Sequence, residues 1–368
     1  MPITRLADVD ILDGNGKEKN ADLAFVGSPG NILSSDAEPD VTVDGKGCTI
    51  IPGLIDSKLD SGPSEYALPL SASHGTTTAI DGSSSSSESQ ALRSTAAKDP
   101  VLPFYLASGS AIGPEKVELV SMLNYSGIQT VKTPREARRL VEAKILSHQA
   151  DFIKIIVDQP GLEEDIIEAA VEETHRRGKL AVAQSCQVES YSLAVEYGFD
   201  ILSPVPVDGE LDPELIERIV SKGLGIIPTL CFLQKAIPVW NKSRPDYQFS
   251  YALEAVRALN DAGARICAGS SSNNWANFSL PFGKGLHNEL QLLAKAGVSN
   301  EKLFKAVTSE PASLFHLADR GVIRPGRVAD LVMVEGDPLK DIRFLSKIRS
   351  TWLRGIPRFD RDSFSSPK

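Results

Sequence analysis

The chain has 368 residues, with 39 lysines and arginines against 48 aspartates and glutamates, which gives a formal net charge of −9. This length suits about two domains, or one large barrel with an appendage, and the 42% share of hydrophobic residues is ordinary for a globular protein. The acidic balance, together with the absence of any basic block in the sequence, disfavours nucleic acid as a partner.

The cysteines and the apolar runs bear on the compartment. The four cysteines are widely scattered and form no CxxC pair, which indicates reduced thiols in an intracellular protein. The first residues lack the apolar region of a secretory signal, and no run approaches the roughly 18 apolar residues of a membrane span. We therefore expect a cytoplasmic protein with no membrane partner.

The two ends of the chain share one pattern. Residues 1–50 hold short strand-like pieces broken by glycine, aspartate, asparagine and proline, and residues 321–355 do the same. Because isolated hairpins are unstable, we expect the two ends to pair. The sequence predicts a small composite β-sandwich domain, made of residues 1–50 plus 321–368, beside a second domain of residues 51–320.

Between the ends, short apolar runs alternate with segments of helical periodicity. The predicted strands are residues 51–57, 77–81, 104–110, 152–158, 180–186, 201–205, 225–230 and 265–271. The clearest amphipathic helices are residues 134–149, 163–178 and 212–223. Eight short apolar strands alternating with helices are typical of a closed α/β barrel, the (β/α)8 or TIM-like fold. An open doubly wound sheet is the alternative, but no GxGxxG follows the first strand.

One serine-rich segment, residues 82–89, follows the second predicted strand. We interpret it as a flexible loop in which a serine caps the next helix. A phosphate-binding loop is less favoured, because the segment contains a single glycine.

Several segments together resemble the amidohydrolase superfamily, especially its imidazolonepropionase-like and prolidase-like branch. They include IIPGLIDSKLD, SHGTTTAID, GKLAVAQSC, ARICAGSS and the long stretch AVTSEPASLFHLADRGVIRPGRVADLVMVEGDPLKDI. The resemblance covers nearly the whole chain and implies a metal-dependent hydrolase with a (β/α)8 barrel. In that family one or two divalent ions activate water against an amide, ester or ring C–N bond.

The metal-ligand positions of the family are mostly changed here. The resemblance implies an HxH pair on the first barrel strand, where this chain has Lys58 and Asp60. It implies a histidine on strand five, one on strand six and an aspartate on strand eight, where this chain has Gln184, Pro204 and Ser271. The lysine of strand four, which the family carboxylates, is the one position that is kept.

These replacements are poor ligands for a divalent ion. Such ions need imidazole, thiolate or carboxylate donors at three or four positions, whereas Pro204 has no side-chain donor and Lys58 is a cation. We predict no catalytic metal and no other cofactor. A residual metal site formed by Asp60, Cys186 and Lys154 is the less favoured alternative.

The replacing residues are themselves candidates for chemistry. Lys58 and Asp60 are two residues apart on one strand and so point to the same side, as do Gln184 and Cys186. With Lys154 they would meet at the C-terminal end of the barrel, where barrel enzymes hold their active sites. Two ammonium groups against one carboxylate give a charge near +1, which together with burial lowers a lysine pKa. A neutral lysine can then act as a general base, donate to an oxyanion or form a Schiff base.

The catalytic candidates are thus Lys58, Asp60, Lys154 and Cys186. The alternative is a salt bridge that only fills the space of the lost metal. Aromatic residues cluster in the segments after strands seven and eight and suggest an apolar surface for an organic ligand. The substrate-binding candidates are Gln184, Ser271, Trp240, Trp275, Phe278 and His287. For His287 a core or capping role is the favoured alternative, and no histidine is placed for a Ser-His-Asp triad.

The sequence therefore predicts a metal-independent enzyme that acts on a medium-sized, largely apolar molecule by lysine and aspartate acid–base chemistry, as an isomerase, cyclase or lyase. One alternative is hydrolysis of a non-peptide C–N bond, as in the family, with irregular metal ligands as a variant of it. The other is a catalytically inactive protein that binds a small molecule. The expected partner is a small-molecule substrate, and the resemblance allows a homodimer.

Overall fold

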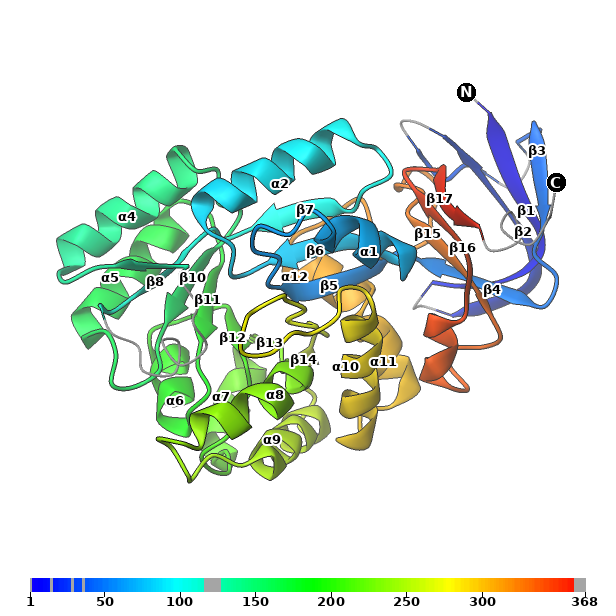
Figure 1. The fold of residues 1–368 in the computed structure, drawn as a ribbon. Coiled ribbons are helices and arrows are strands. Elements are labelled where there is room, and N and C mark those ends of the chain that lie inside the picture. The colour runs from blue at the N-terminus through cyan, green and yellow to red at the C-terminus, as the bar shows by residue number, and fades with distance from the viewer. Residues whose placement is uncertain (1, 14–15, 28–29, 35–36, 116–126, 361–368) are drawn as a thin grey trace.

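The computed structural model describes residues 2–13, 16–27, 30–34, 37–115 and 127–360. The two ends of the chain form one seven-stranded sheet beside the barrel (Figure 1). Its strands are β1 (Ile3–Leu12), β2 (Lys17–Val26), β3 (Val41–Asp44), β4 (Cys48–Pro52), β15 (Leu331–Glu335), β16 (Ile348–Leu353) and β17 (Ile356–Asp360). Strand β4 joins the two halves, because it pairs with β1 from the first end and with β15 from the last. The composite β domain is confirmed; residues 361–368 of its predicted range lie outside the described residues.

This sheet folds over its own core. The ring of Phe25 on β2 meets the ring of Trp352 on β16 edge to face, with 5.7 Å between centroids. The two strands are four positions apart in the order β16-β15-β4-β1-β2. In a flat sheet they would be about 19 Å apart. The contact therefore requires two halves packed face to face, in the manner of a sandwich.

The structure has a parallel strand at each of the eight positions where the sequence predicts a barrel strand. These strands are β5 (Leu54–Leu59), β6 (Thr76–Asp81), β7 (Phe104–Ala107), β10 (Ile153–Ile156), β11 (Ala181–Gln184), β12 (Ile201–Ser203), β13 (Gly225–Ile226) and β14 (Arg265–Ile266). The third strand is interrupted after β7 and resumes as β8 (Ala111–Gly113), which is flanked by β9 (Ile128–Thr130). The first piece pairs with β6 and the second with β10, so the interruption bridges two parts of the ring.

Backbone hydrogen bonds close the ring between its first and last strands. The amide of Ser57 donates to the carbonyl of Ala268 at 2.9 Å, and the amide of Ser271 donates to the carbonyl of Lys58 at 2.7 Å. The segment after β14 therefore continues that strand alongside β5. The predicted (β/α)8 barrel is confirmed.

Helices surround the barrel (Figure 1). They are α1 (Ala67–Ser73), α2 (Ser86–Lys98), α4 (Pro134–Leu146), α5 (Glu164–Arg176), α6 (Val188–Glu196), α7 (Pro213–Ser221), α8 (Leu230–Trp240), α9 (Phe249–Asp261), α10 (Lys284–Lys295), α11 (Asn300–Ala306) and α12 (Ser309–Leu314), with a 3-10 turn η1 (Ile342–Ser346). Helix α4 begins as its sequence predicts: Thr133 accepts from the amide of Glu136, and Ala137 and Val141 are buried. No helix among the described residues is long and apolar enough to cross a membrane.

The serine-rich loop after β6 is held at several points. The predicted cap is confirmed, since Ser85 and Glu88 form a reciprocal capping box at the start of α2. The amides of Ser83 and Ser84 donate to Oδ1 of Asp81 at 2.9 and 3.0 Å, and flexibility of the loop stays a prediction. The serines supply donors to a buried carboxylate at the barrel mouth.

Candidate active site

An ion pair lies where the first and last barrel strands meet. Nζ of Lys58, on β5, lies 3.5 Å from Oδ2 of Asp60 and 3.1 Å from Oγ of Ser271. The hydroxyl of Ser271 donates to the same carboxylate oxygen. Ser271 adopts a left-handed conformation, with φ of 48°, which is uncommon for a residue with a side chain. The three side chains thus form one connected group. The ion pair agrees with the prediction that Lys58 and Asp60 point to the same side of their strand.

Lys154 on β10 joins this group from across the barrel. Its Nζ donates to Oγ of Ser83 at 3.3 Å. A Cβ placed on Gly82 would lie 3.8 Å from Cε of Lys58 and 3.9 Å from Cδ of Lys154, so both lysines pass beside this glycine. The exposed fraction is 7% for Lys58, 0% for Asp60 and 3% for Lys154. The structure therefore brings the three candidates together in a nearly dry environment.

Burial and charge set the protonation of this group. Burial lowers the pKa of Lys154 to about 7, and the charge of Lys58 lowers it as well, against the opposite effect of Asp60, Asp81 and Asp158. Burial alone would raise the pKa of Asp60, but the charges of Lys58 and Lys154 hold it below its usual value. Near pH 7 a large fraction of Lys154 is therefore the neutral amine, while Asp60 is ionised. The predicted site charge of +1 left out two further carboxyl groups, Asp81 and Asp158, which also act on Lys154.

One carboxylate oxygen in the group has no partner. Oδ1 of Asp60 is buried and accepts no hydrogen bond from any described residue. A buried acceptor left unpaired costs about 1–3 kcal/mol, and such atoms are rare in proteins. A ligand with an N–H or O–H group would satisfy it.

A second buried carboxylate, Asp81 at the end of β6, was not singled out from the sequence. Its Oδ2 accepts from Oγ of Ser84 at 2.6 Å, from the hydroxyl of Tyr105 at 3.0 Å and from Oγ of Ser61. Ser84 Oγ also accepts from the amide of Gly62 at 3.0 Å. Asp81 therefore ties the loop after β5 to the loop after β6. The only sequence signal was its place directly before the serine run.

Cys186 has a different set of contacts. Its thiol donates to Oδ2 of Asp158 at 3.3 Å and its amide donates to Oδ1 at 2.6 Å. Burial raises the pKa of the thiol well above its usual value and raises that of Asp158 to about 6. The thiol is thus protonated near neutral pH, and its link to Lys154 runs through Asp158.

Gln184 is half-buried at the end of β11, in register with Ile156 on β10.

The predicted aromatic residues meet around Phe232 of α8, which belongs to the aromatic clustering seen in the sequence but was not among the substrate-binding candidates. Its ring centroid lies 5.6 Å from that of Trp240, 6.0 Å from that of Trp275 and 6.0 Å from that of Phe278. We call these four residues the aromatic cluster. Nζ of Lys58 lies 5.1 Å from the Phe232 centroid, so the cluster covers the charged group. Trp275 and Phe278 are half-buried and form its more exposed part.

His287 lies elsewhere, on α10, where it contacts the end of α1. Its Nε2 hydrogen-bonds to the carbonyl of His74 at 2.9 Å, and burial lowers its pKa to about 4. The ring is therefore neutral near pH 7, and its Nε2 is already hydrogen-bonded within the protein. This agrees with the core or capping role that the sequence favoured for His287. Its role as a substrate-binding residue has no contact in its favour.

Glu289, two residues further along α10, positions the aromatic cluster. Its carboxylate oxygens accept from the amides of Leu230 at 2.8 Å and Cys231 at 2.7 Å. These are first-turn amides of α8 that have no partner within the helix. Phe232 is the next residue, so Glu289 fixes the start of the helix that carries it. Sequence reasoning missed Glu289; the signal was an acidic residue within the apolar stretch HNELQLL.

The donor set does not fit a divalent metal ion. No three or more histidine, cysteine, aspartate or glutamate side chains are arranged to hold one within the described parts of the chain. Lys58 places an ammonium beside Asp60, and Pro204 offers only a carbonyl, which accepts from the hydroxyl of Tyr191 at 2.8 Å. Zinc-type ions need several imidazole, thiolate or carboxylate donors around one point. Metal independence remains a prediction that this donor chemistry supports.

Comparison with known proteins identifies the fold. Residues 70–356 match the sequence model of the Amidohydrolase family. No curated protein matches the chain. Similar solved structures include a putative prolidase from Bifidobacterium longum, with 23% identity, a TM-score of 0.81 and coverage of 97% of this chain and 94% of that one. Molinate hydrolase has 16% identity, a TM-score of 0.82 and coverage of 100% and 97%. A. niger ochratoxinase has 18% identity, a TM-score of 0.80 and coverage of 98% and 96%.

Proposed function

Because the chain belongs to the amidohydrolase family, we propose that it is an enzyme in which lysine and aspartate side chains replace the family's metal. The observation that carries the proposal is the burial of Lys154 in the same group as the Lys58–Asp60 ion pair, a setting that lowers the pKa of Lys154 to about 7. The pKa of Lys154, about 7, is the value at which a lysine works as a general base at neutral pH.

The proposed reaction is a proton transfer next to a carbonyl group of the substrate. The amine of Lys154 removes a proton from the adjacent carbon, the C–H electron pair forms the C=C bond of an enolate, and the π pair of the C=O bond moves to the carbonyl oxygen. The ammonium of Lys58, held by Asp60, donates a hydrogen bond to that oxygen as its charge develops. Isomerisation follows when Lys154 returns the proton to another carbon as the C=O bond forms again. Elimination follows when the bond to a group on the next carbon breaks and that group takes the proton. Cyclisation follows when the enolate carbon attacks a second carbonyl carbon of the substrate, whose oxygen takes the electron pair of its C=O bond and the proton.

The surroundings favour an apolar substrate with a polar group at one end. The aromatic cluster contributes an apolar surface directly over Lys58. The unpaired Oδ1 of Asp60 adds an acceptor for a donor group of the substrate. Because the charged side chains are nearly completely buried, substrate entry requires Trp275 and Phe278, the more exposed members of the cluster, to move aside.

Hydrolysis of a C–N bond is the second candidate. Family membership favours it, and the names of similar structures include hydrolases. In this case a water molecule bound to Oδ1 of Asp60 would attack the carbon of the C–N bond, and Lys154 would take a proton from the water. The C–N bond would then break as Lys154 returns that proton to the departing amine. The same residues would serve both reactions.

An isotope experiment tests the two reactions together. The purified protein is incubated with an extract of apolar metabolites, once in D2O and once in H2(18)O, and the products are examined by mass spectrometry. Deuterium on carbon supports proton transfer, whereas 18O in a product supports hydrolysis. Both labels should be lost in Lys154→Met. A wild-type protein that incorporates neither label and only retains a ligand would overturn the enzyme proposal.

A further inference from the structure

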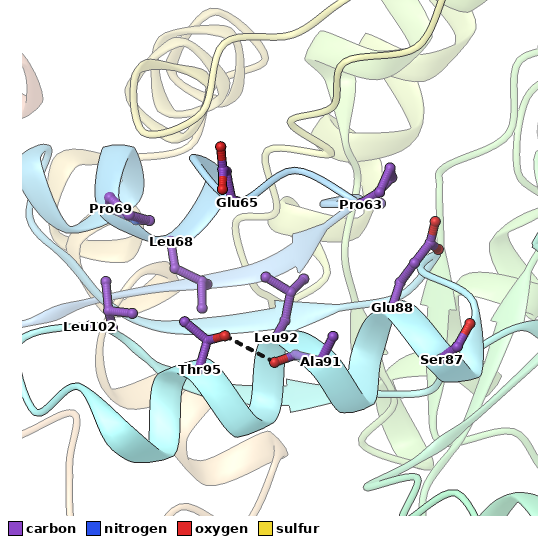
Figure 2. A pocket seen from close by; sticks show the side chains of 11 residues that line it. Pro63, Glu65, Leu68, Pro69, Ser87, Glu88, Ala91, Leu92, Thr95 and Leu102 are labelled. Atoms are coloured by element: carbon purple, nitrogen blue, oxygen red, sulfur yellow. Dashed lines mark hydrogen bonds between the residues drawn. The ribbon is translucent and has the colours of Figure 1, made fainter.

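A cavity opens on the flank of the barrel mouth, between α1 and α2 (Figure 2). Its volume is about 380 Å³, within the range of small-molecule sites in proteins. Leu68 points into it from α1 and Leu92 from α2. The remaining apolar lining residues are Pro63, Pro69, Ala91 and Leu102. The cavity lies apart from the lysines, none of which lines it.

The polar lining of this cavity has one sign of charge. Glu65 and Glu88 contribute carboxylates, and no lysine, arginine or histidine is among the lining residues. Glu88 accepts from the amide of Ser85 through one oxygen, while Glu65 is exposed. Neither glutamate forms an ion pair with a described residue, and Arg93 of α2 is bound to Asp151 instead. An apolar cavity whose edge holds two carboxylates without a basic partner among the described residues complements an organic cation.

The walls of the cavity continue directly into the candidate active site. One wall is the segment that follows Asp60, and its Gly62 amide donates to Ser84 Oγ. The other wall is α2, which follows Ser83, the residue that accepts from Lys154. A ligand between the walls would therefore brace both loops that position the charged group.

We propose that the cavity between α1 and α2 is a second small-molecule site, which binds a protonated amine with a compact apolar body and thereby rigidifies residues 60–66 and 82–95. This site is independent of the proposed function: the cavity either binds such a cation or does not, whatever reaction the lysines perform. Its consequence for the active site is a change in the mobility of two loops.

Three matched probes test the charge preference. Phenethylammonium, 2-phenylethanol and phenylacetate share one ring and differ in charge, and their binding to the full chain is measured by ligand-observed NMR titration. We expect phenethylammonium to bind at least fivefold more tightly than the alcohol and phenylacetate to bind most weakly. The double variant E65Q/E88Q should bring the ammonium and the alcohol to similar affinity. Equal affinities of the three probes for the wild type would overturn the proposal.

Steric variants test the location. Ala91→Trp fills the cavity from an exposed position on α2, whereas Ser94→Trp adds the same side chain to an exposed position outside it. Ala91→Trp should weaken phenethylammonium binding at least tenfold and Ser94→Trp should not change it. If Ala91→Trp fails to fold, Thr95→Trp fills the same cavity from another exposed position.

A third set of measurements separates this site from the barrel mouth. Trp275→Ala should leave phenethylammonium binding unchanged, and the probe should slow hydrogen exchange in residues 60–66 and 82–95. Loss of binding in Trp275→Ala with retention in Ala91→Trp would place the probe in the aromatic cluster and overturn the proposal. Unchanged hydrogen exchange at saturation would overturn its second part.

Discussion

Nζ of Lys58 lies 5.1 Å from the ring centroid of Phe232 and 3.5 Å from Oδ2 of Asp60, so one ammonium joins the aromatic cluster to the buried carboxylate. A cation over an aromatic face gains about 2 kcal/mol when it is desolvated. This contact, together with Asp60, keeps a lysine where the family resemblance implies a metal ligand. Lys58 is thus held in one position, while Lys154 has a single hydrogen bond through its Nζ to Ser83.

Lys154→Met should separate catalysis from packing. Methionine has nearly the same length and no charge, so it removes the proposed base and keeps the contact beside Gly82. We expect the turnover rate to fall at least about a hundredfold, the lower range for acid–base catalysis. The melting temperature should fall by less than about 3 °C, because the buried amine is costly to desolvate. A large loss of stability with activity per folded molecule preserved would instead indicate a structural salt bridge.

The pH profile should report the same amine. The base form of Lys154 is required, and its pKa is about 7, so kcat/KM should rise about tenfold per pH unit below 7 and level off above it. Asp60 stays ionised throughout, because its pKa is held below the usual value. The measurement is kcat/KM from pH 5.5 to 9. A profile that is flat between pH 6 and 8 would contradict Lys154 as the base.

Most of the fold could be predicted because its pattern is local. Apolar runs bounded by turn residues marked the barrel strands, and helix periodicity marked α4, α5 and α7. The errors lie in strand length: the predicted strand at 225–230 ends at Ile226, and α8 begins at Leu230 after Thr229 with φ of 47°. An apolar run that continues from a strand into a buried helix has no internal marker of the change.

The candidate site was less predictable because its contacts cross between strands. Alternation along β5 correctly placed Lys58 and Asp60 on one side, which needs only local geometry. Asp81 acts on Lys154 from the end of β6, a strand that does not pair with β10, and Asp158 acts from the segment directly after β10. In the sequence each resembles an ordinary residue at a strand end. The hydrogen bond of His287 joins it to His74, and no periodicity of a helix or strand relates two residues so far apart in the sequence.

Elemental analysis should test the metal prediction. We expect well under one zinc, manganese, iron or nickel ion per purified chain, because the donor set around Asp60 does not fit such an ion. Incubation with EDTA should change neither the melting temperature nor any activity found in the isotope experiment. A stoichiometric ion whose removal lowers either one would contradict metal independence.

Glu289→Gln should destabilise the protein more at pH 5 than at pH 8. The carboxylate accepts from the amides of Leu230 and Cys231, whereas glutamine has one acceptor and leaves an amide unpaired, at a cost of about 1–3 kcal/mol. Burial raises the pKa of Glu289 from 4.5 to about 7. A raised pKa gives a stabilising contribution that is complete below 4.5 and is lost as the pH rises through 7.

The free energy of unfolding of the wild type therefore loses this contribution between pH 5 and 8. The variant has a glutamine at position 289, which does not titrate. Urea unfolding at both pH values measures the difference in the free energy of unfolding. Glu254→Gln, at an exposed position on α9, is the matched control and should change stability little at either pH. An equal loss for Glu289→Gln at both pH values would contradict a buried, titrating cap.

Asp60→Asn and Trp275→Ala together should distinguish an enzyme from a binding protein. An enzyme needs Asp60 in the transition state even where the ground state makes little use of it. Asp60→Asn keeps the shape and removes the charge that holds Lys58, so turnover should be abolished while ligand affinity stays within a few fold. Trp275→Ala should weaken ligand binding by about 1–3 kcal/mol in either case, as expected for a desolvated aromatic contact. Calorimetric titration with the ligand from the isotope experiment gives both affinities. If Asp60→Asn changes affinity alone and the wild type forms no product from that ligand, the chain is a binding protein and its buried lysines serve recognition.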